Sequence, residues 1–194
     1  PNGGEILPAG STFVITWGAP STAMSFRPYY SLNNGTKWQA ITTARVTGSS
    51  YTWKVPTVAA NTASCQVRVV AYDARGRQLG LDQSDAPFTI QGMTLTTPNG
   101  GETLRTGVAV PIAWTTYSLS SSAAKTILSL TKDGGVSWQT IATLTGNPGS
   151  WSWTPTASET ATNCRIQVTV KDARARSIAS DTSDAGFTLL PPTP

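Results

Sequence analysis

One five-residue string occurs twice in this chain, and it marks a duplication of the whole sequence. PNGGE stands at Pro1–Glu5 and again at Pro98–Glu102. After each copy the same landmarks follow in the same order, and they pair as Trp17 with Trp114, Trp38 with Trp138, Trp53 with Trp153, Cys65 with Cys164, Asp73 with Asp172, Asp85 with Asp184 and Phe88 with Phe187. Since the spacing changes only between landmarks, insertions fall in loops. The repeat is therefore a domain-sized unit of about 95 residues, larger than a solenoid or propeller repeat.

Within each copy, apolar residues alternate with polar ones. Cys65, Val67 and Val69 share one side of a stretch whose other side carries Gln66 and Arg68. This period of two is typical of a strand with one buried and one wet face. No stretch has a helical period, and turn signals rich in glycine, asparagine and proline separate the apolar stretches. Six or seven short strands per copy predict an all-β fold of two tandem immunoglobulin- or fibronectin III-like β-sandwiches.

We expect the first domain over residues 1–90 and the second over residues 91–194. The second PNGGE is preceded by Met93–Thr97, an alternating stretch that we predict to be the first strand of its domain. The first PNGGE has no such counterpart, so domain one is expected to lack this strand and to expose a bare sheet edge. Two explanations stay open. Either the sequence is part of a longer protein, or another chain supplies the strand, as in filaments built by strand addition.

Composition favours an extracellular location and argues against nucleic-acid binding. The net charge is +4, yet no run of lysine and arginine stands out. Charged residues make up only 12% of the chain, about half the usual share for a soluble domain. No apolar run is long enough to span a bilayer, so no transmembrane segment is predicted. We therefore expect a secreted or cell-surface protein with no nucleic-acid partner.

Neither cysteines nor histidines offer a catalytic or metal site. Cys65 and Cys164 hold equivalent inward positions in different domains, so we expect two buried thiols and no disulfide. Histidine is absent, which removes the commonest general base and the commonest metal ligand. The sequence accordingly predicts no catalytic residue, no metal and no cofactor.

Two acidic pairs stand just before the last strand of each copy, Asp82 with Asp85 and Asp181 with Asp184. Paired carboxylates can bind calcium or hydrolyse glycosides. A pair that recurs in both copies at a turn is better explained by capping of that turn. The calcium question stays open at this point, and we predict a structural role.

Each copy also carries a hairpin signature. TKDGGVSW at Thr131–Trp138 fits the Asp-box pattern, and SLNNGTKW at Ser31–Trp38 is a degraded form. Asp133 and Asn33 are expected to accept backbone N–H groups across a tight turn. Six tryptophans at framework positions are assigned to the cores, namely Trp17, Trp38, Trp53, Trp114, Trp138 and Trp153. Trp151 remains as the one spare ring for sugar stacking.

Two arginine-rich turns are the best candidates for surface contacts. DARGR at Asp73–Arg77 and DARAR at Asp172–Arg176 are expected to join the last two strands of each domain. Arginine side chains suit the carboxylate or sulfate groups of acidic polysaccharides. The alternative is a solvated hairpin with weak Asp–Arg pairs. The predicted contact residues are Arg75, Arg77, Arg174 and Arg176.

The ordered pattern of each copy is more specific than any one motif. It runs PNGGE, a strand ending in Trp, the Gly–Trp hairpin, YTWKVP or WSWTP, a Cys-containing strand ending in DAR, then SD and FT. This pattern resembles the Ser/Thr-rich extracellular domain family related to the yeast KNH-type cell-wall proteins, over both copies almost end to end. The resemblance implies a sandwich fold, an extracellular and often tandem setting, and no agreed catalytic residues.

These observations together predict a non-enzymatic structural or assembly module of a cell-surface or secreted protein. Its expected partners are copies of itself, in an oligomer or a filament held by β-strand contacts, or other surface proteins. Cell-wall or acidic polysaccharide is a further candidate. The alternative is a carbohydrate-binding accessory module of a larger secreted or cell-wall protein. An enzyme is disfavoured by the missing histidine and the turn-bound acids.

Overall fold

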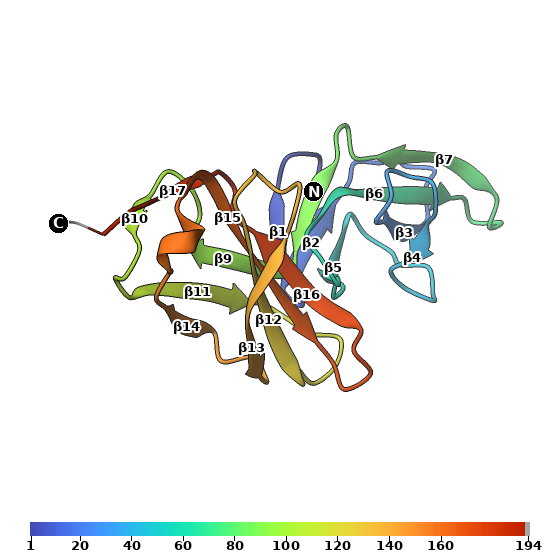
Figure 1. The fold of residues 1–194 in the computed structure, drawn as a ribbon. Helices are drawn as coiled ribbons and strands as arrows, with labels where there is room; N and C mark the ends of the chain where they lie inside the picture. Colours follow the sequence, from blue (N-terminus) through green and yellow to red (C-terminus); the bar gives the residue numbers. More distant parts are fainter. Residues whose placement is uncertain (193–194) are drawn as a thin grey trace. The chain divides into compact units, whose positions relative to one another are not determined.

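The computed structural model describes residues 1–192, which are almost entirely β-structure (Figure 1). The chain divides into two compact units. Unit 1 comprises Pro1–Pro56 and Thr62–Gln91, and unit 2 comprises Thr57–Asn61 and the chain from Gly92 onward. The boundary predicted between residues 90 and 91 stays a prediction. No helix within residues 1–192 has the length and apolar content needed to cross a lipid bilayer.

Unit 1 is built from two sheets. The larger sheet has the order β1-β8-β6-β3-β4, with β7 also paired to β6, and the smaller sheet pairs β2 with β5. The strands are β1 (Ile6–Pro8), β2 (Thr12–Thr16), β3 (Ser25–Ser31), β4 (Gln39–Ala40), β5 (Ser50–Lys54), β6 (Thr62–Tyr72), β7 (Gln78–Gln83) and β8 (Phe88–Gln91). Strand β1 runs parallel to β8, and the remaining pairs are antiparallel.

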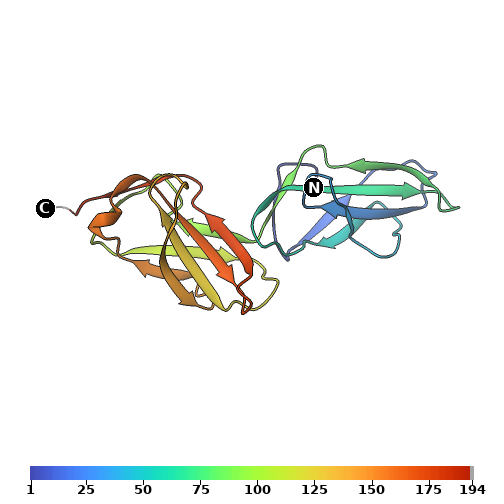
Figure 2. The ribbon, with the colours of Figure 1, turned by 45° about the vertical axis from the view of Figure 1, so that its right-hand side comes forward.

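Unit 2 repeats this plan with one more strand. Its larger sheet has the order β10-β17-β15-β12-β13, with β16 paired to β15, and its smaller sheet has the order β14-β11-β9. The elements are β9 (Met93–Thr97), β10 (Thr103–Arg105), β11 (Val110–Thr116), β12 (Lys125–Thr131), β13 (Gln139–Thr145), β14 (Ser150–Trp153), the 3-10 turn η1 (Ala157–Glu159), β15 (Ala161–Lys171), β16 (Ser177–Thr182) and β17 (Phe187–Leu190). The prediction of an all-β fold with two tandem immunoglobulin- or fibronectin III-like sandwiches is confirmed (Figure 2).

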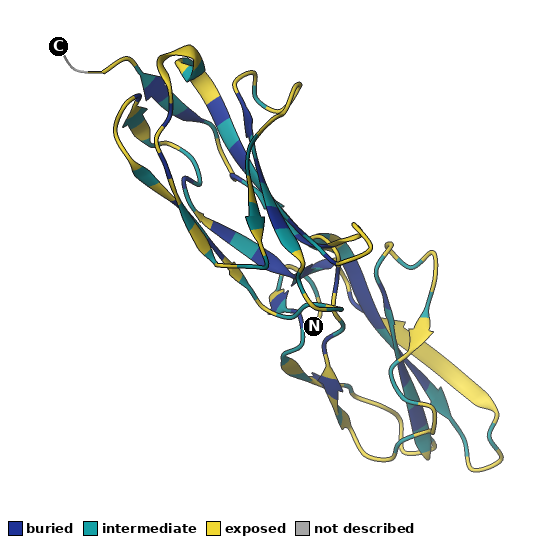
Figure 3. Ribbon diagram, turned by 60° about the horizontal axis from the view of Figure 1, so that its bottom comes forward, coloured by how far each residue is buried: buried dark blue, intermediate teal, exposed yellow. Residues whose placement is uncertain are grey.

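The predicted alternation holds along β15 and only in part along β6. On β15, Cys164, Ile166, Val168 and Val170 are buried and the residues between them are not. On β6, Gln66 was predicted on the wet face but is 8% exposed, between the buried Cys65 and Val67. Figure 3 shows the buried and exposed stretches of both units. Cys65 and Cys164 are fully buried free thiols, as predicted, and lie beside branched aliphatic residues such as Val67 in unit 1 and Ile166 in unit 2. Because these positions face the opposing sheet, each thiol packs as a small apolar group.

The assignment of six tryptophans to the cores is only half right. Trp53, Trp114 and Trp153 are buried. Trp17 and Trp38 are only half-buried, and Trp138 is 37% exposed. The Nε1 of Trp138 donates to the carbonyl oxygen of Gly135 at 3.2 Å, so this ring covers its own hairpin and does not enter the space between the sheets.

Candidate functional site

The repeated pentapeptide is a structural clip that uses one acid of each predicted pair. In unit 1, Glu5 accepts the backbone N–H groups of Asn2 and Gly3 at 2.7 and 2.9 Å. The side-chain amide of Asn2 donates to Asp85 at 2.6 Å, and the backbone N–H of Asp85 donates back to Asn2 at 3.2 Å. Unit 2 repeats the same bonds with Asn99, Gly100, Glu102 and Asp184. The clip ties the start of each repeat to the turn before its last strand.

The other acid of each pair behaves differently in the two units. In unit 2, Asp181 accepts the backbone N–H of Leu95 at 2.7 Å and the side-chain amide of Asn61 at 3.1 Å. Burial raises the pKa of Asp181 above its usual value. In unit 1 the equivalent Asp82 lies on β7, opposite Val69 of β6, and is exposed. Its carboxylate has no hydrogen-bond partner among residues 1–192.

The described part of the chain contains no group of three or more histidine, cysteine, aspartate and glutamate side chains that could hold a metal ion. The acids of the pairs that are hydrogen-bonded, Asp85, Asp181 and Asp184, meet amide and backbone donors of their own units. The arrangement supports the structural interpretation of these acids.

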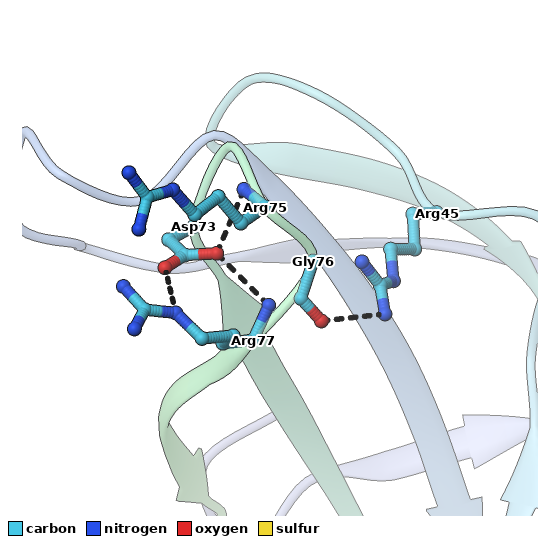
Figure 4. A network of polar contacts seen from close by, with 5 residues as sticks. All are labelled: Arg45, Asp73, Arg75, Gly76 and Arg77. Carbon is cyan, nitrogen blue, oxygen red and sulfur yellow. Dashed lines mark hydrogen bonds and ion pairs between the residues drawn. The ribbon is translucent and has the colours of Figure 1, made fainter.

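The arginine-rich turn of unit 1 closes on itself through Asp73 (Figure 4). Asp73 accepts the backbone N–H groups of Arg75 and Arg77 at 2.9 Å each, and the Nε of Arg77 at 2.8 Å. These bonds hold the pKa of Asp73 below its usual value, the backbone N–H of Arg77 contributing most. On the far side of the turn, Arg45 donates to the carbonyl oxygen of Gly76 at 3.2 Å.

The equivalent turn of unit 2 is built in the same way. Asp172 accepts the backbone N–H groups of Arg174 and Arg176 at 2.9 and 3.0 Å, and the Nε of Arg176 at 2.8 Å. The two turns join β6 to β7 and β15 to β16. The prediction that they join the last two strands was wrong, because β7 and β16 are each followed by one more strand, β8 and β17.

The structure thus brings Arg75 together with Arg77 in one turn, and Arg174 together with Arg176 in the other. Arg77 and Arg176 are held by ion pairs to the aspartate at the base of the turn, at 2.8 and 2.7 Å. The side chain of Arg75 extends away from the turn (Figure 4). Their role as surface contacts stays a prediction.

Sequence reasoning missed a stack of arginine and aromatic side chains on the outer face of unit 1. The guanidinium of Arg68 lies 4.4 Å from the ring centre of Trp38 and 5.1 Å from that of Tyr29. Arg45 covers the ring of Tyr72 at 3.6 Å. The signal was present, because Arg68 has the outward parity on β6 and lies opposite Tyr29 on β3. The pairing of those strands was not known from the sequence.

Unit 2 contains a groove beside the spare tryptophan. It has a volume of about 650 Å³. Trp151 lines it together with Lys132, Gln139 and Glu159. Trp151 is half-buried, so part of its ring faces the groove and part packs on the core. An aromatic face among hydrogen-bonding side chains is the arrangement that suits a sugar ring.

Unit 1 contains a second groove, of about 460 Å³, between its two sheets. Its walls include Ile15 and Trp17 from the smaller sheet and Val67, Val69 and Asp82 from the larger one. A smaller hollow of about 200 Å³ continues from it and shares Trp17 and Asp82 as lining residues. Since Trp17 faces this opening, its ring is half-exposed where the equivalent Trp114 is buried.

No family model and no curated protein matches the sequence. Among solved structures the chain is similar to the fibronectin(III)-like modules of Clostridium thermocellum CbhA, with 16% identity and a TM-score of 0.38 over 97% of this chain and 92% of that chain. It is also similar to the FN1–FN3 domains of chicken CNTN1, with 13% identity and a TM-score of 0.34 over 96% and 65% of the two chains. A tetra-tandem repeat from the extending region of a large adhesion protein shares 16% identity at a TM-score of 0.29, over 92% of this chain and 49% of that one. The chain spans about half the length of that last protein. The two sandwiches are assigned from the strand order of the sheets in this chain.

Proposed function

We propose that the chain is a non-enzymatic structural module of an extracellular or cell-surface protein. The observation that carries this proposal is the use of its acidic side chains. Those that accept hydrogen bonds within their own unit are Glu5, Asp73, Asp85, Glu102, Asp133, Glu159, Asp172, Asp181 and Asp184. Acids engaged in this way hold turns together and are poorly placed to move protons on a substrate. The chain has no histidine to take that role.

The extracellular part of the proposal is supported by composition and by the motif order. Low charge and abundant serine and threonine are typical of secreted β-proteins, and the repeat pattern resembles the KNH-related cell-wall family. The partners that fit are other surface proteins or copies of the same chain. Residues 1–90 and 91–194 act in this proposal as two separate domains.

Assembly into filaments is the finer form of this proposal, and sedimentation velocity with electron microscopy tests it. Strand contacts between copies give a series of oligomers that grows with concentration and ends in fibres. The catalytic alternative is tested on a panel of chromogenic glycosides and esters. Turnover that disappears in Asp82→Asn would contradict a purely structural role, because Asp82 is the exposed acid without a described partner.

A carbohydrate-binding role is the second candidate, favoured by the Trp151 groove. Affinity electrophoresis in gels containing β-glucan measures it, with Trp151→Ala as the test and Trp138→Ala as the control. Trp138 is also exposed and lies in the same unit, but it does not line the groove. Binding lost in the first variant and kept in the second supports the sugar site. Equal retardation of both variants contradicts it.

Contact with acidic polysaccharide is proposed for the two arginine turns. Arg75→Ala combined with Arg174→Ala leaves the ion pairs of Arg77 and Arg176 in place, so both turns keep their shape. We expect elution from a sulfated-polysaccharide column at lower salt, because each lost contact removes one charge-assisted hydrogen bond. Unchanged elution contradicts the assignment. Arg105→Ala, which changes the net charge away from the turns, is the control.

A further inference from the structure

The two units differ at one place in the sandwich, which is occupied in unit 2 by β9. This strand runs antiparallel to β11, with Leu95 opposite Trp114 and Met93 opposite Thr116. Met93 and Leu95 are both fully buried. Strand β9 therefore completes the smaller sheet and closes the side of the core next to β16.

In unit 1 the equivalent place is the groove of about 460 Å³. Its lining includes Trp17, Gly18 and Asp82, the counterparts of Trp114, Thr115 and Asp181, which contact β9 in unit 2. Strand β2 ends at Thr16, whereas β11 continues through Trp114 to Thr116, which is the stretch that pairs with β9. Strand β2 therefore ends just before the residues whose counterparts in β11 pair with β9.

The opposite wall shows the same difference. All six residues of β7 are exposed, whereas β16 contains two buried residues. Leu79 on β7 is 45% exposed, and its counterpart Ile178 on β16 is 3% exposed. Leu79 and Leu81 line the hollow that continues the groove. An apolar wall of this kind loses its contact with water when a strand covers it.

The carboxylate of Asp82, at the groove, is in a position to accept a hydrogen bond from a strand. In unit 2, Asp181 accepts the backbone N–H of Leu95, in the middle of β9. Its counterpart Asp82 lines the groove and meets no donor among residues 1–192. A carboxylate at this position is matched to the backbone N–H of an incoming strand.

The clip fixes the direction of the occupant. The hydroxyl of Ser84 donates to the carbonyl oxygen of Pro1 at 3.0 Å, and that of Ser183 donates to the carbonyl oxygen of Pro98 at 2.9 Å. Pro1 thus stands in unit 1 where Pro98 stands in unit 2. In unit 2 the residue before Pro98 is Thr97, the last of β9. A strand placed like β9 therefore ends at the position that directly precedes Pro1.

We propose that the groove of unit 1 is a strand-binding site whose occupant is an extended segment that continues into Pro1. The segment carries apolar side chains at the positions of Met93 and Leu95, and its central backbone N–H is accepted by Asp82. This inference depends on unit 1 and on its comparison with unit 2. It leaves the proposed structural role unchanged, and it excludes the strand of a second copy as the occupant of this groove.

The test joins a copy of Gln91–Thr97, with the sequence QGMTLTT, to the nitrogen of Pro1. We expect the melting temperature of unit 1 to rise by about 10 °C or more, since two apolar side chains become buried in a domain of this size. Hydrogen exchange followed by mass spectrometry should show amides over residues 17–19 exchanging about tenfold more slowly. The melting of unit 2 serves as an internal reference and should not change.

Two matched variants decide the outcome. The same segment with serine in place of its methionine and leucine should give no rise, because it has no apolar side chains to bury. Asp82→Ala should reduce the gain from the original segment while leaving the chain without a segment unaffected. The proposal is overturned if the original and serine segments act alike. It is also overturned if the unmodified chain already protects residues 17–19 in oligomers, since the occupant is then a strand of a second copy.

Discussion

Asp133 and Asn33 occupy the same position in two hairpins, and the difference between them is a charge. Asp133 accepts the hydroxyl and backbone N–H of Ser137, the hydroxyl of Thr131 and the N–H of Val136. Asn33 accepts the hydroxyl of Ser31 and the N–H of Lys37 through one oxygen. Both hairpins close, so the side-chain amide of Asn33 is sufficient to form the turn. The carboxylate adds charge-assisted bonds.

These bonds, led by the hydroxyl of Ser137, hold the pKa of Asp133 well below its usual range. A depressed pKa means that the bonds stabilise the folded state above about pH 4, the unfolded value, and that this stabilisation is lost as the pH falls toward the folded value. We expect the indole N–H resonance of Trp138 to shift in acid, below pH 4. Asp133→Asn should remove the shift. The indole of Trp38 is the reference, because Asn33 does not titrate, and an equal shift there would contradict this account.

The two thiols provide a second prediction at this scale. Burial raises the pKa of Cys65 and of Cys164, which lowers the thiolate fraction that reacts. Under native conditions at pH 8 we expect both thiols to react with a disulfide reagent at least about a hundredfold more slowly than in urea. Two thiols per chain should be counted after unfolding without a reductant. A count of zero would show a disulfide instead.

The PNGGE clip is the element that explains the duplicated string. Gly3 has a φ of 138°, and a Cβ on Gly3 would lie 2.6 Å from the Cβ of Ala86. Gly100 repeats this approach, at 2.5 Å from the Cβ of Ala185. The backbone of the clip and the turn before the last strand are therefore too close for any side chain. The asparagine and glutamate supply the bonds that hold them there.

Substituting the two glycines of one clip should separate contact from backbone strain. Gly3→Ala should lower the free energy of unfolding of unit 1 by about 2 kcal/mol or more, because both the φ and the contact are unfavourable. Gly4→Ala is the control. Gly4 has a φ of 82° but nothing within 4 Å of the added Cβ, so we expect a loss of about 1 kcal/mol. Urea unfolding measures both, and equal losses would mean that the contact with Ala86 relaxes freely.

Strands with a regular period could be predicted from the sequence, and the positions of single rings could not. Alternation around Cys164 placed the buried face of β15, because parity is a local property of a strand. Around Cys65 it placed the core residues but missed the burial of Gln66, which is 8% exposed. The fate of Trp138 depends on a bond to Gly135 within its own hairpin, and the stack on Arg68 depends on which strands are neighbours. The clip could be recognised as a repeated string. Its hydrogen bonds to Asp85 and Asp184 could not be predicted, because they join residues that are far apart in each repeat.

At the scale of the whole molecule, the two units share one strand order and differ in the number of strands in the smaller sheet. Unit 2 has a three-stranded smaller sheet and a continuous buried core. Unit 1 has a two-stranded smaller sheet and a groove along it. Since stability follows the apolar area removed from water, unit 1 should unfold at the lower urea concentration. One chain should therefore give two transitions, and each can be assigned by a substitution in its own core.

Ile15 and Ile112 are the matched pair for that assignment. They are equivalent in the repeat, lie on β2 and β11, and are 3% and 0% exposed. Ile15→Ala should shift only the first transition, and Ile112→Ala only the second, each by about 2–5 kcal/mol. Because Ile15 lines the groove, its neighbourhood can relax, and its loss should fall nearer the lower limit. A single transition that moves with either substitution would show that the two cores unfold as one, and the description of two independent sandwiches would then be wrong.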